Sequence, residues 1–330
     1  MIVSPRNLCC VLVLALWLLV GCKSESGPAK LLPPPRGLEY AVMTIPDANP
    51  LTAEKAHLGK ILFYDQRLSS TGAMACVTCH LPELAWTDGE RLSKKANGEM
   101  NTRNSPSLYN VAYQPHFYWD GRAPTLEKNI EAAWKNNMSG DPDAAAKKLA
   151  EIAGYQPLFT AAFKTGPTGA NIVEALASFL RTLTHGDSTY DRGELGDAAN
   201  RGKKVFEQRC QVCHIPPLFT DNMVHIVGVG DVKADPGRGK QEPTKMGAFK
   251  TPSLRSAARS KPYFHDGSAK ELRDAVKLMA QGGIDNENLD PVLKGLRTLA
   301  PVTEAEIDDL VEFVRALDNV QKHEAPPIPK

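Results

Sequence analysis

The pentapeptide CVTCH occupies residues 76–80, and the pentapeptide CQVCH occupies residues 210–214. In a Cys-x-x-Cys-His motif both thiols can form thioether bonds with a haem, and the adjacent histidine can ligate its iron. A single Cys-x-x-Cys is usually a metal knuckle, a redox pair or a chance spacing, but the added histidine, present twice, favours two c-type haems. The residues expected to hold them are Cys76, Cys79, Cys210, Cys213, His80 and His214.

The composition fits a chain with two folded domains. Its 330 residues are 42% hydrophobic and 23% charged, which suffices for two ordinary cores and excludes a disordered or fibrous protein. The formal net charge is only +1, so no long-range field would recruit nucleic acid or an anionic membrane surface. We therefore expect no nucleic-acid partner.

The N-terminal segment is typical of an export signal. Arg6 precedes an apolar run over residues 8–20, which is short for a membrane span. The run leads into Leu-Val-Gly-Cys, ending at Cys22, which resembles the bacterial lipoprotein processing box. This predicts a lipoprotein signal over residues 1–21, a lipid on Cys22, and a location on the periplasmic side of a bacterial membrane, with the outer membrane favoured because Lys23 is not aspartate. The alternative is an ordinary cleaved signal.

Residues 22–45 are predicted to form a lipidated tether, because the stretch KSESGPAKLLPPPRG at residues 23–37 is polar and proline-rich. Contact with the membrane would then be through the lipid anchor alone. Of the seven cysteines, Cys9 and Cys10 fall in the signal and Cys22 takes the lipid. The haem motifs use the other four, so none remains for a disulfide.

The periodic segments of the mature chain are helical. Apolar residues recur at helical spacing after Thr52, over residues 172–183 and over residues 307–317. Thr303 and Glu306 form a Thr-x-x-Glu capping box at the start of the last of these segments. No convincing run of alternating strands is present, so we predict an all-α fold.

The two halves of the chain repeat the same motifs in the same order. Gly-Lys-x-x-Phe, the haem motif, a (Ser/Thr)-Pro-Ser-Leu stretch and an aromatic-rich Asp-Gly turn all occur twice. We therefore expect two cytochrome c-like helical domains, each with one covalently bound haem. The predicted bounds are 46–188 for the first, 189–320 for the second and 321–330 for a tail.

The repeat makes the two haems unequal. Met279 lies fourteen residues after His265 in the second half, whereas Ala133 lies fourteen residues after Trp119 in the first. A thioether can fill the sixth position of haem iron and favour electron transfer, whereas alanine leaves that position open to a small reactant. The alternative for Met279 is a core methionine. The weaker candidate ligands are His57, His116, His185, His225 and Met100.

Residues 50–318 resemble the bacterial di-haem cytochrome c peroxidase family, including its relatives that mature methylamine dehydrogenase. The resemblance rests on both haem motifs, Met279 in register and the stretches FYWDGR, FKTPSLR, PYFHDG and DPGRG. It implies that the first haem reacts with hydrogen peroxide, that the second relays electrons from a small redox protein such as a cytochrome c or copper protein, and that Trp119 lies between them. A homodimer is compatible with the resemblance.

The resemblance also implies further site residues. A calcium ion between the domains would be held by the Asn104 side chain and by backbone carbonyls of Ser260 and Pro262, where Ser260 replaces the usual threonine. Asn129 matches a distal-pocket glutamine and would hydrogen-bond a bound peroxide. An indole between two haems can pack against both and carry an electron, which gives Trp119 a physical reason to be there.

Two positions depart from the family pattern. Ala96 stands where classical members have the histidine that closes the peroxidatic haem, so this chain should be permanently open. The family glutamate that moves protons falls at Ser139 by direct count, and Asp141 and Glu131 are the nearest carboxylates. Asp141 is the predicted acid/base residue, with helix capping as its alternative role.

Three functions are compatible with these residues. The favoured one is an oxidoreductase of the cytochrome c peroxidase type. The second is a peroxide-dependent enzyme that oxidises a partner protein, although such maturation enzymes have tyrosine where this chain has Met279. A pure electron carrier is the third, and Ala133 argues against it.

Overall fold

The computed structural model describes residues 33–39 and 41–330. The predicted signal peptide, Cys22 and the first part of the tether lie outside these residues. Within the described part, no helix has both the length and the apolar character needed to cross a membrane.

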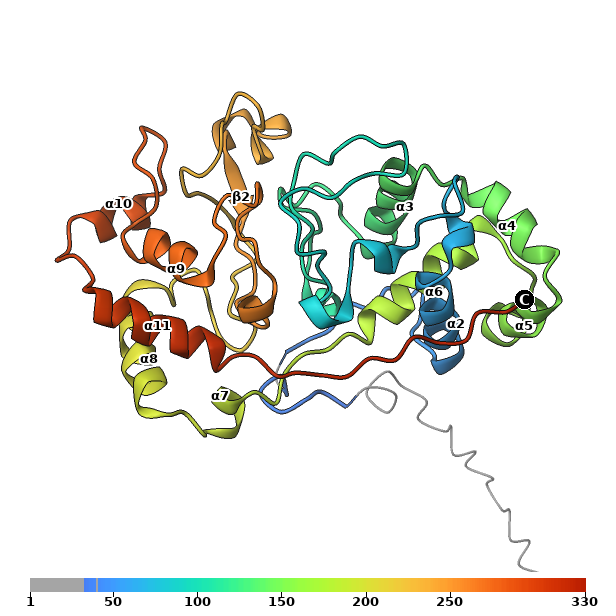
Figure 1. Cartoon of the computed structure of the whole chain (residues 1–330), viewed down its shortest axis with the longest axis horizontal. Helices are drawn as coiled ribbons and strands as arrows, with labels where there is room; N and C mark the ends of the chain where they lie inside the picture. The colour runs from blue at the N-terminus through green and yellow to red at the C-terminus, as the bar shows by residue number, and fades with distance from the viewer. Residues whose placement is uncertain (1–32, 40) are drawn as a thin grey trace, which may run out of the picture.

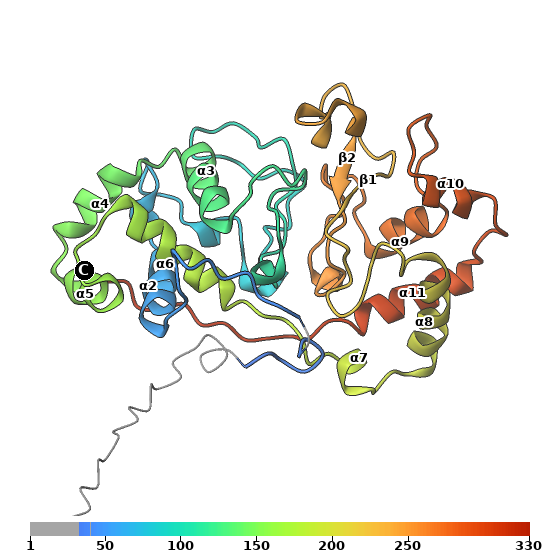
Figure 2. The same ribbon diagram turned by 180° about the vertical axis from the view of Figure 1, so that it is seen from behind.

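The structure consists of two helical halves that lie side by side (Figures 1 and 2). The first half holds α2 (Ala53–Phe63), α3 (Leu126–Met138), α4 (Pro142–Ala150), α5 (Gln156–Phe163) and α6 (Gly169–Arg181). The second holds α7 (Thr189–Arg192), α8 (Asp197–Arg209), β1 (Val224–Ile226), β2 (Ala248–Lys250), α9 (Leu272–Ala280), α10 (Pro291–Arg297) and α11 (Glu304–Arg315). Short 3-10 helices are Gln66–Leu68, Cys76–Thr78, Pro82–Leu84, Val111–Tyr113, Ala153–Tyr155, Arg238–Lys240, Pro243–Lys245 and Ala257–Arg259.

Polar side chains begin the long helices. Thr125 and Thr168 accept hydrogen bonds from backbone N–H groups in the first turns of α3 and α6. At the start of α11, Thr303 and Glu306 form the reciprocal capping box that the sequence predicts. These caps fix where each helix begins, and they therefore fix which side chains face the interior.

Each half is built around one tightly packed helix pair, α2 against α6 and α8 against α11. Gly59 in α2 lies against the backbone carbonyl of Ala175, and Gly202 in α8 lies against that of Asp309. A β-carbon at either glycine would overlap that carbonyl, so only glycine lets the two backbones approach so closely. This explains why the Gly-Lys-x-x-Phe motif occurs once in each half.

The aromatic turns also repeat in three dimensions. Phe117 bridges Ala123 in the first half, and Tyr263 bridges Ala269 in the second. Both pairs are antiparallel, and each pair is related to the other by a shift of 146 residues, because 263 − 117 and 269 − 123 are both 146. The sequence repeat is therefore a structural repeat.

The described residues form two three-residue strands, which the sequence did not predict. β1 and β2 pair antiparallel, with His225 opposite Phe249. Three residues are too few to produce a readable alternation of polar and apolar side chains. The all-α prediction therefore holds only in its coarser form: the protein is rich in helix and has little sheet.

Two segments outside the halves pack against them. Leu38 is fully buried with Ala112 and Tyr113, although residues 22–45 were predicted to be a tether. That prediction is wrong for this part of the segment, because the burial of an apolar side chain in a core is favourable in free energy. At the other end, the tail runs back along the first half to α5 (Figures 1 and 2), and Arg67 donates to the carbonyl of Pro329 at 2.8 Å.

Candidate haem and peroxide site

A continuous cavity of about 750 Å³ runs between the two halves. Its volume lies within the range of cofactor sites. The side chains that line it include those of both haem motifs and of the predicted relay and ligand positions. They are Cys76, Cys79, His80, Trp119, Ala133, Cys210, Cys213, His214 and Met279.

The four cysteines are free thiols in apolar surroundings. Burial raises the pKa of Cys76 to about 12 and that of Cys79 to about 11. The second pair behaves in the same way, with the pKa of Cys210 raised to about 12 and that of Cys213 to about 11, again chiefly by burial. Both thiol pairs line the cavity together with their motif histidines, which is the arrangement that covalent attachment of a haem requires.

The two motif histidines are oriented as iron ligands. Nδ1–H of His80 donates to the carbonyl of Trp86 at 2.8 Å, and Nδ1–H of His214 donates to that of Phe219 at 2.9 Å. Burial lowers the pKa of both imidazoles, so both are neutral. A carbonyl on Nδ1 fixes the tautomer in which Nε2 carries the lone pair, which is the arrangement that ligates metals.

Helices α3 and α9 supply the residues that distinguish the two motifs. Met279 in α9 and Ala133 in α3 both line the cavity. Met279 also packs against the cluster of Leu289, Leu293 and Leu296, which limits how far its side chain can move. A thioether is thus available beside one motif, and only a methyl group is available at the equivalent place beside the other.

Among the described residues of the loop that could close the first motif, no histidine or methionine lines the cavity. Ala96 has a methyl side chain and donates its backbone N–H to Asn137 at 2.8 Å. Met100 is 54% exposed and does not line the cavity. Lys94 and Lys95 do line it, and Lys95 pairs with Glu99 at 3.4 Å.

Trp119 lies where the two halves meet. Its indole Nε1–H donates to the carbonyl of Asn104 at 2.9 Å, and its own carbonyl accepts from the backbone N–H of Lys250 at 2.6 Å. These two bonds hold the ring between a loop of the first half and β2 of the second.

Arg103 connects the halves beside Trp119, a role that sequence reasoning missed. Its guanidinium pairs with Asp120 at 2.8 Å and with Asp235 of the second half at 2.6 Å, and it lies 5.2 Å from the centre of the Phe249 ring. Asp235 belongs to the DPGRG stretch, one of the stretches on which the family resemblance rests, and this was the sequence feature that could have pointed to the contact. Both carboxylates are committed to this ion pair.

Three amide side chains of α3 line the cavity beside apolar ones. Asn129, Asn136 and Asn137 line the cavity, and the Tyr118 hydroxyl donates to the backbone carbonyl of Asn129 at 3.3 Å. Among the described residues of α3, no carboxylate lines the cavity, and Glu131 instead pairs with two exposed lysines of its own helix.

The structure does not bring Asp141 to the cavity. Asp141 is exposed at the N-cap of α4, where its carboxylate accepts from the backbone N–H groups of Asp143 and Ala144, each at 2.9 Å. These bonds lower the pKa of Asp141. The prediction that Asp141 acts as the acid/base residue is therefore corrected to the alternative, helix capping.

The three predicted calcium-binding residues line the same cavity. The Asn104 amide nitrogen donates to the carbonyls of Glu90 and Arg91 at 2.9 and 3.4 Å. In the described part of the chain, no hydrogen bond uses Asn104 Oδ1 or the main-chain carbonyls of Ser260 and Pro262. Three uncommitted oxygens fit a hard cation.

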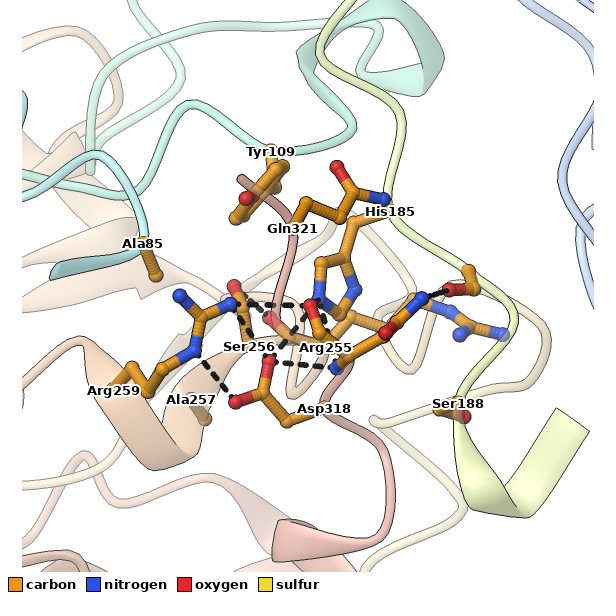
Figure 3. A network of polar contacts seen from close by, with 12 residues as sticks. Ala85, Tyr109, His185, Ser188, Arg255, Ser256, Ala257, Arg259, Asp318 and Gln321 are labelled. Carbon is orange, nitrogen blue, oxygen red and sulfur yellow. Dashed lines mark hydrogen bonds and ion pairs between the residues drawn. The ribbon is translucent and has the colours of Figure 1, made fainter. Parts of the chain in front are cut away.

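Of the weaker candidate ligands, His225 and His185 are paired with carboxylates. Both ring nitrogens of His225 are taken, by Asp290 at 2.7 Å and Asp221 at 2.9 Å. Cys213 lies close to this group but belongs to the haem motif, so the cluster forms no separate metal site. His185 is fully buried in the polar network between the halves that Figure 3 shows, and it pairs with Asp318 at 3.1 Å. His57 and His116 do not line the cavity.

Comparisons with known proteins identify this class of site. The family described as di-haem cytochrome c peroxidase matches residues 53–199. The methylamine utilization protein MauG of Methylophilus methylotrophus is 38% identical over 303 residues, which cover 86% of this chain and 89% of that protein. The cytochrome-c peroxidase IdrP1 of Pseudomonas sp. (strain SCT) is 32% identical, with 86% of each chain covered. The crystal structure of a MauG-like protein associated with microbial copper homeostasis superposes with a TM-score of 0.77 at 29% identity, covering 88% of this chain and 94% of that one.

The site and the fold therefore define an oxidoreductase of the di-haem peroxidase class. The chain belongs to the di-haem cytochrome c peroxidase family, which includes MauG, and the sequence resemblance is confirmed.

Proposed function

We propose that the chain reduces hydrogen peroxide at an open haem bound by Cys76, Cys79 and His80, with electrons that enter at a second haem. The second haem would be held by Cys210, Cys213, His214 and Met279. The observation that carries this proposal is the inequality of Met279 and Ala133, which line one cavity from equivalent helices. A closed site suits electron transfer, and an open one admits a reactant.

The proposed reaction converts one peroxide, two electrons and two protons into two waters. The haem iron, when bound, supplies the redox centre at which the O–O bond breaks. Asn129 lines the cavity and can donate its side-chain N–H to a bound peroxide, which positions the oxygen atoms. Trp119 lies at the junction of the halves and provides an aromatic step for electrons. The donor would be a small redox protein.

A second candidate is an enzyme that uses peroxide to oxidise a partner protein. It is favoured by α3, which places amides and no carboxylate in the cavity lining, since proton transfer to a bound peroxide would be slow without a carboxylate from this helix. The 38% identity to MauG supports it as well. Met279 in place of tyrosine favours the peroxidase.

Rapid mixing of the holoprotein with peroxide and a reduced cytochrome c or copper protein tests the proposal. A peroxidase oxidises the donor over many turnovers. Negligible turnover with several donors, together with an oxidised state that persists until a partner protein is added, would instead establish the second candidate.

Two further assignments, a lipid anchor and a calcium ion, are compatible with an exported di-haem peroxidase. A lipid on Cys22 would hold the protein at the periplasmic side of a bacterial membrane, where exported c-type cytochromes are assembled. A calcium ion at Asn104, Ser260 and Pro262 would tie the first half to the second beside Trp119, because Asn104 also accepts the Trp119 indole N–H through its carbonyl.

A further inference from the structure

A chain of aromatic residues begins at the proximal ligand of the open site and leads away from Trp119. Its first member is Trp86, whose carbonyl accepts the Nδ1–H of His80 at 2.8 Å. The Trp86 indole is fully buried, and its N–H has no hydrogen-bond acceptor. Core packing explains the burial of the ring, but it does not explain an unpaired donor, which normally costs stability.

The second member is Tyr109, which is 3% exposed. Its ring centre lies 6.4 Å from that of Trp86, in an edge-to-face arrangement. Tryptophan and tyrosine are the most easily oxidised aromatic side chains, and two such rings in contact can pass an electron between them. Figure 3 shows Tyr109 at the edge of the polar network between the halves, close to His185 and Gln321.

The third member comes from the C-terminal tail. The Tyr109 hydroxyl lies 3.1 Å from Nε2 of His323, within hydrogen-bond distance, and the centre of the His323 ring lies 4.9 Å from that of Trp86. Burial lowers the pKa of His323, and the nearby charges of Lys60 and Arg259 lower it further. The imidazole is therefore neutral and can accept a proton. The groups near the Tyr109 hydroxyl are His323 and Trp86, with the charged pair of Arg259 and Asp318 beyond them.

This arrangement has the parts that oxidation of a phenol requires. Removing an electron from tyrosine makes its hydroxyl strongly acidic, so the oxidation proceeds easily only where a base within hydrogen-bond reach takes the proton. His323 is such a base and is half-buried at the surface, whereas the hydroxyl of the nearby Tyr113 is buried without a partner. The tail thus places a base beside the hydroxyl of Tyr109, whereas the hydroxyl of Tyr113 has no partner.

We propose that Trp86, Tyr109 and His323 form a second electron route, which delivers oxidising equivalents from the open site to the surface covered by the tail. The inference rests on the proposed reaction with peroxide. Enzyme that has reacted with one peroxide lacks two electrons. Tyr109 returns one of them by way of Trp86 and passes its phenolic proton to His323 Nε2, which leaves a neutral tyrosyl radical. A one-electron reductant at the surface later reduces the radical, and the proton returns from His323 to the Tyr109 oxygen.

Electron paramagnetic resonance of the freeze-quenched holoprotein tests this route. The wild-type protein is mixed with one equivalent of peroxide and no donor, in H2O and in D2O. We expect a tyrosyl radical whose lines narrow in D2O because its oxygen is hydrogen-bonded. Tyr109→Phe should abolish the signal, Trp86→Phe should slow its appearance, and His323→Leu should reduce its yield. Tyr113→Phe is the matched control and should leave the signal unchanged.

The outcomes separate the two proposals. If the haem absorbance responds to peroxide but the radical is absent, or is equally strong in Tyr109→Phe, the relay is refuted and the proposed reaction stands. If the radical depends on Tyr109 but His323→Leu gives the full yield, the tail has no part in the route and the inference fails as stated. If peroxide leaves the haem absorbance unchanged, both proposals are overturned.

Discussion

Met279 and Ala133 occupy the same place in two equivalent helices. Each lies seven residues after the leucine that begins its helix, since 279 − 272 and 133 − 126 are both 7, and each lines the cavity between the halves. The two equivalent helices thus present one potential iron ligand and one methyl group. This difference is the basis for the proposal that the first haem reduces peroxide and the second haem accepts electrons.

The number of cyanide ions bound per chain should equal the number of haems whose sixth coordination position is open. The wild-type holoprotein is expected to bind one cyanide per chain, whereas Met279→Ala should bind two, because its second iron loses the thioether. Optical titration gives the stoichiometry. Met246→Leu is the control, since Met246 lies outside the cavity lining and is partly exposed. A stoichiometry of one in Met279→Ala would mean that another residue closes the second site.

Trp119→Phe should slow electron transfer between the haems. Phenylalanine keeps an aromatic ring but is much harder to oxidise, and it loses the bond from the indole N–H to Asn104. Stopped-flow absorbance after reduction of the second haem measures the transfer. An unchanged rate would remove Trp119 from the route and leave it with a packing role.

Asn129→Ala should slow the reaction with peroxide about tenfold, the effect of losing one good hydrogen bond. Rapid mixing with peroxide in the absence of donor measures the rate. Asp141→Asn is the paired variant and should react at the wild-type rate, because Asp141 caps α4 and does not line the cavity. A slow Asp141→Asn variant would restore the assignment made from sequence.

Acid should weaken the connection between the halves through Asp318. Burial alone would raise the pKa of Asp318, but hydrogen bonds from His185 and Arg259 hold it far below its usual value. A lowered carboxyl pKa contributes stability above the unfolded-state value of about 3.9, and this contribution is lost as the pH falls below it.

Asp318→Asn should therefore cost about 3 kcal/mol at neutral pH, the lower end for breaking a buried ion pair, and the difference from wild type should shrink below pH ~4. Urea unfolding of the holoprotein at several pH values measures it. Glu312→Gln removes an exposed pair with Arg315 and should change the free energy of unfolding by about 0.5 kcal/mol or less. Equal effects of the two variants would contradict the role given to Asp318.

Chelation should loosen the region around Trp119. If calcium binds Asn104, Ser260 and Pro262, its removal with EGTA should lower the melting temperature and slow transfer between the haems, and added calcium should restore both. Magnesium should not, because it prefers a smaller and more regular site. A protein insensitive to EGTA that contains no bound calcium would refute this assignment.

Most of the features that occur once in each half were predicted from the sequence. The haem motifs, the Gly-Lys-x-x-Phe glycines and the Met279 register are local patterns, and the structure places them in equivalent surroundings in both halves. The capping box at Thr303 was also predicted, because it depends on residues only three positions apart. The capping box can be read because its physical cause lies within a few residues, and the other features can be read because the same pattern occurs twice in one chain.

Long-range contacts could not be predicted in this way. The Arg103–Asp235 pair joins residues 132 positions apart, and the contact between Tyr109 and His323 joins residues 214 positions apart. Asp141 was misassigned for the same reason: its distance from Trp119 in sequence did not show that α4 would turn it toward solvent. Leu38 was predicted to lie in a tether because the preceding prolines are typical of a linker, although its side chain is fully buried.

The electron paramagnetic resonance spectrum of the oxidised holoprotein tests the central claim most directly. The inequality of Met279 and Ala133 predicts one high-spin haem with an open position and one low-spin haem with histidine and methionine ligands, in equal amounts. Two low-spin haems would contradict the open site, and with it the proposed reaction with peroxide.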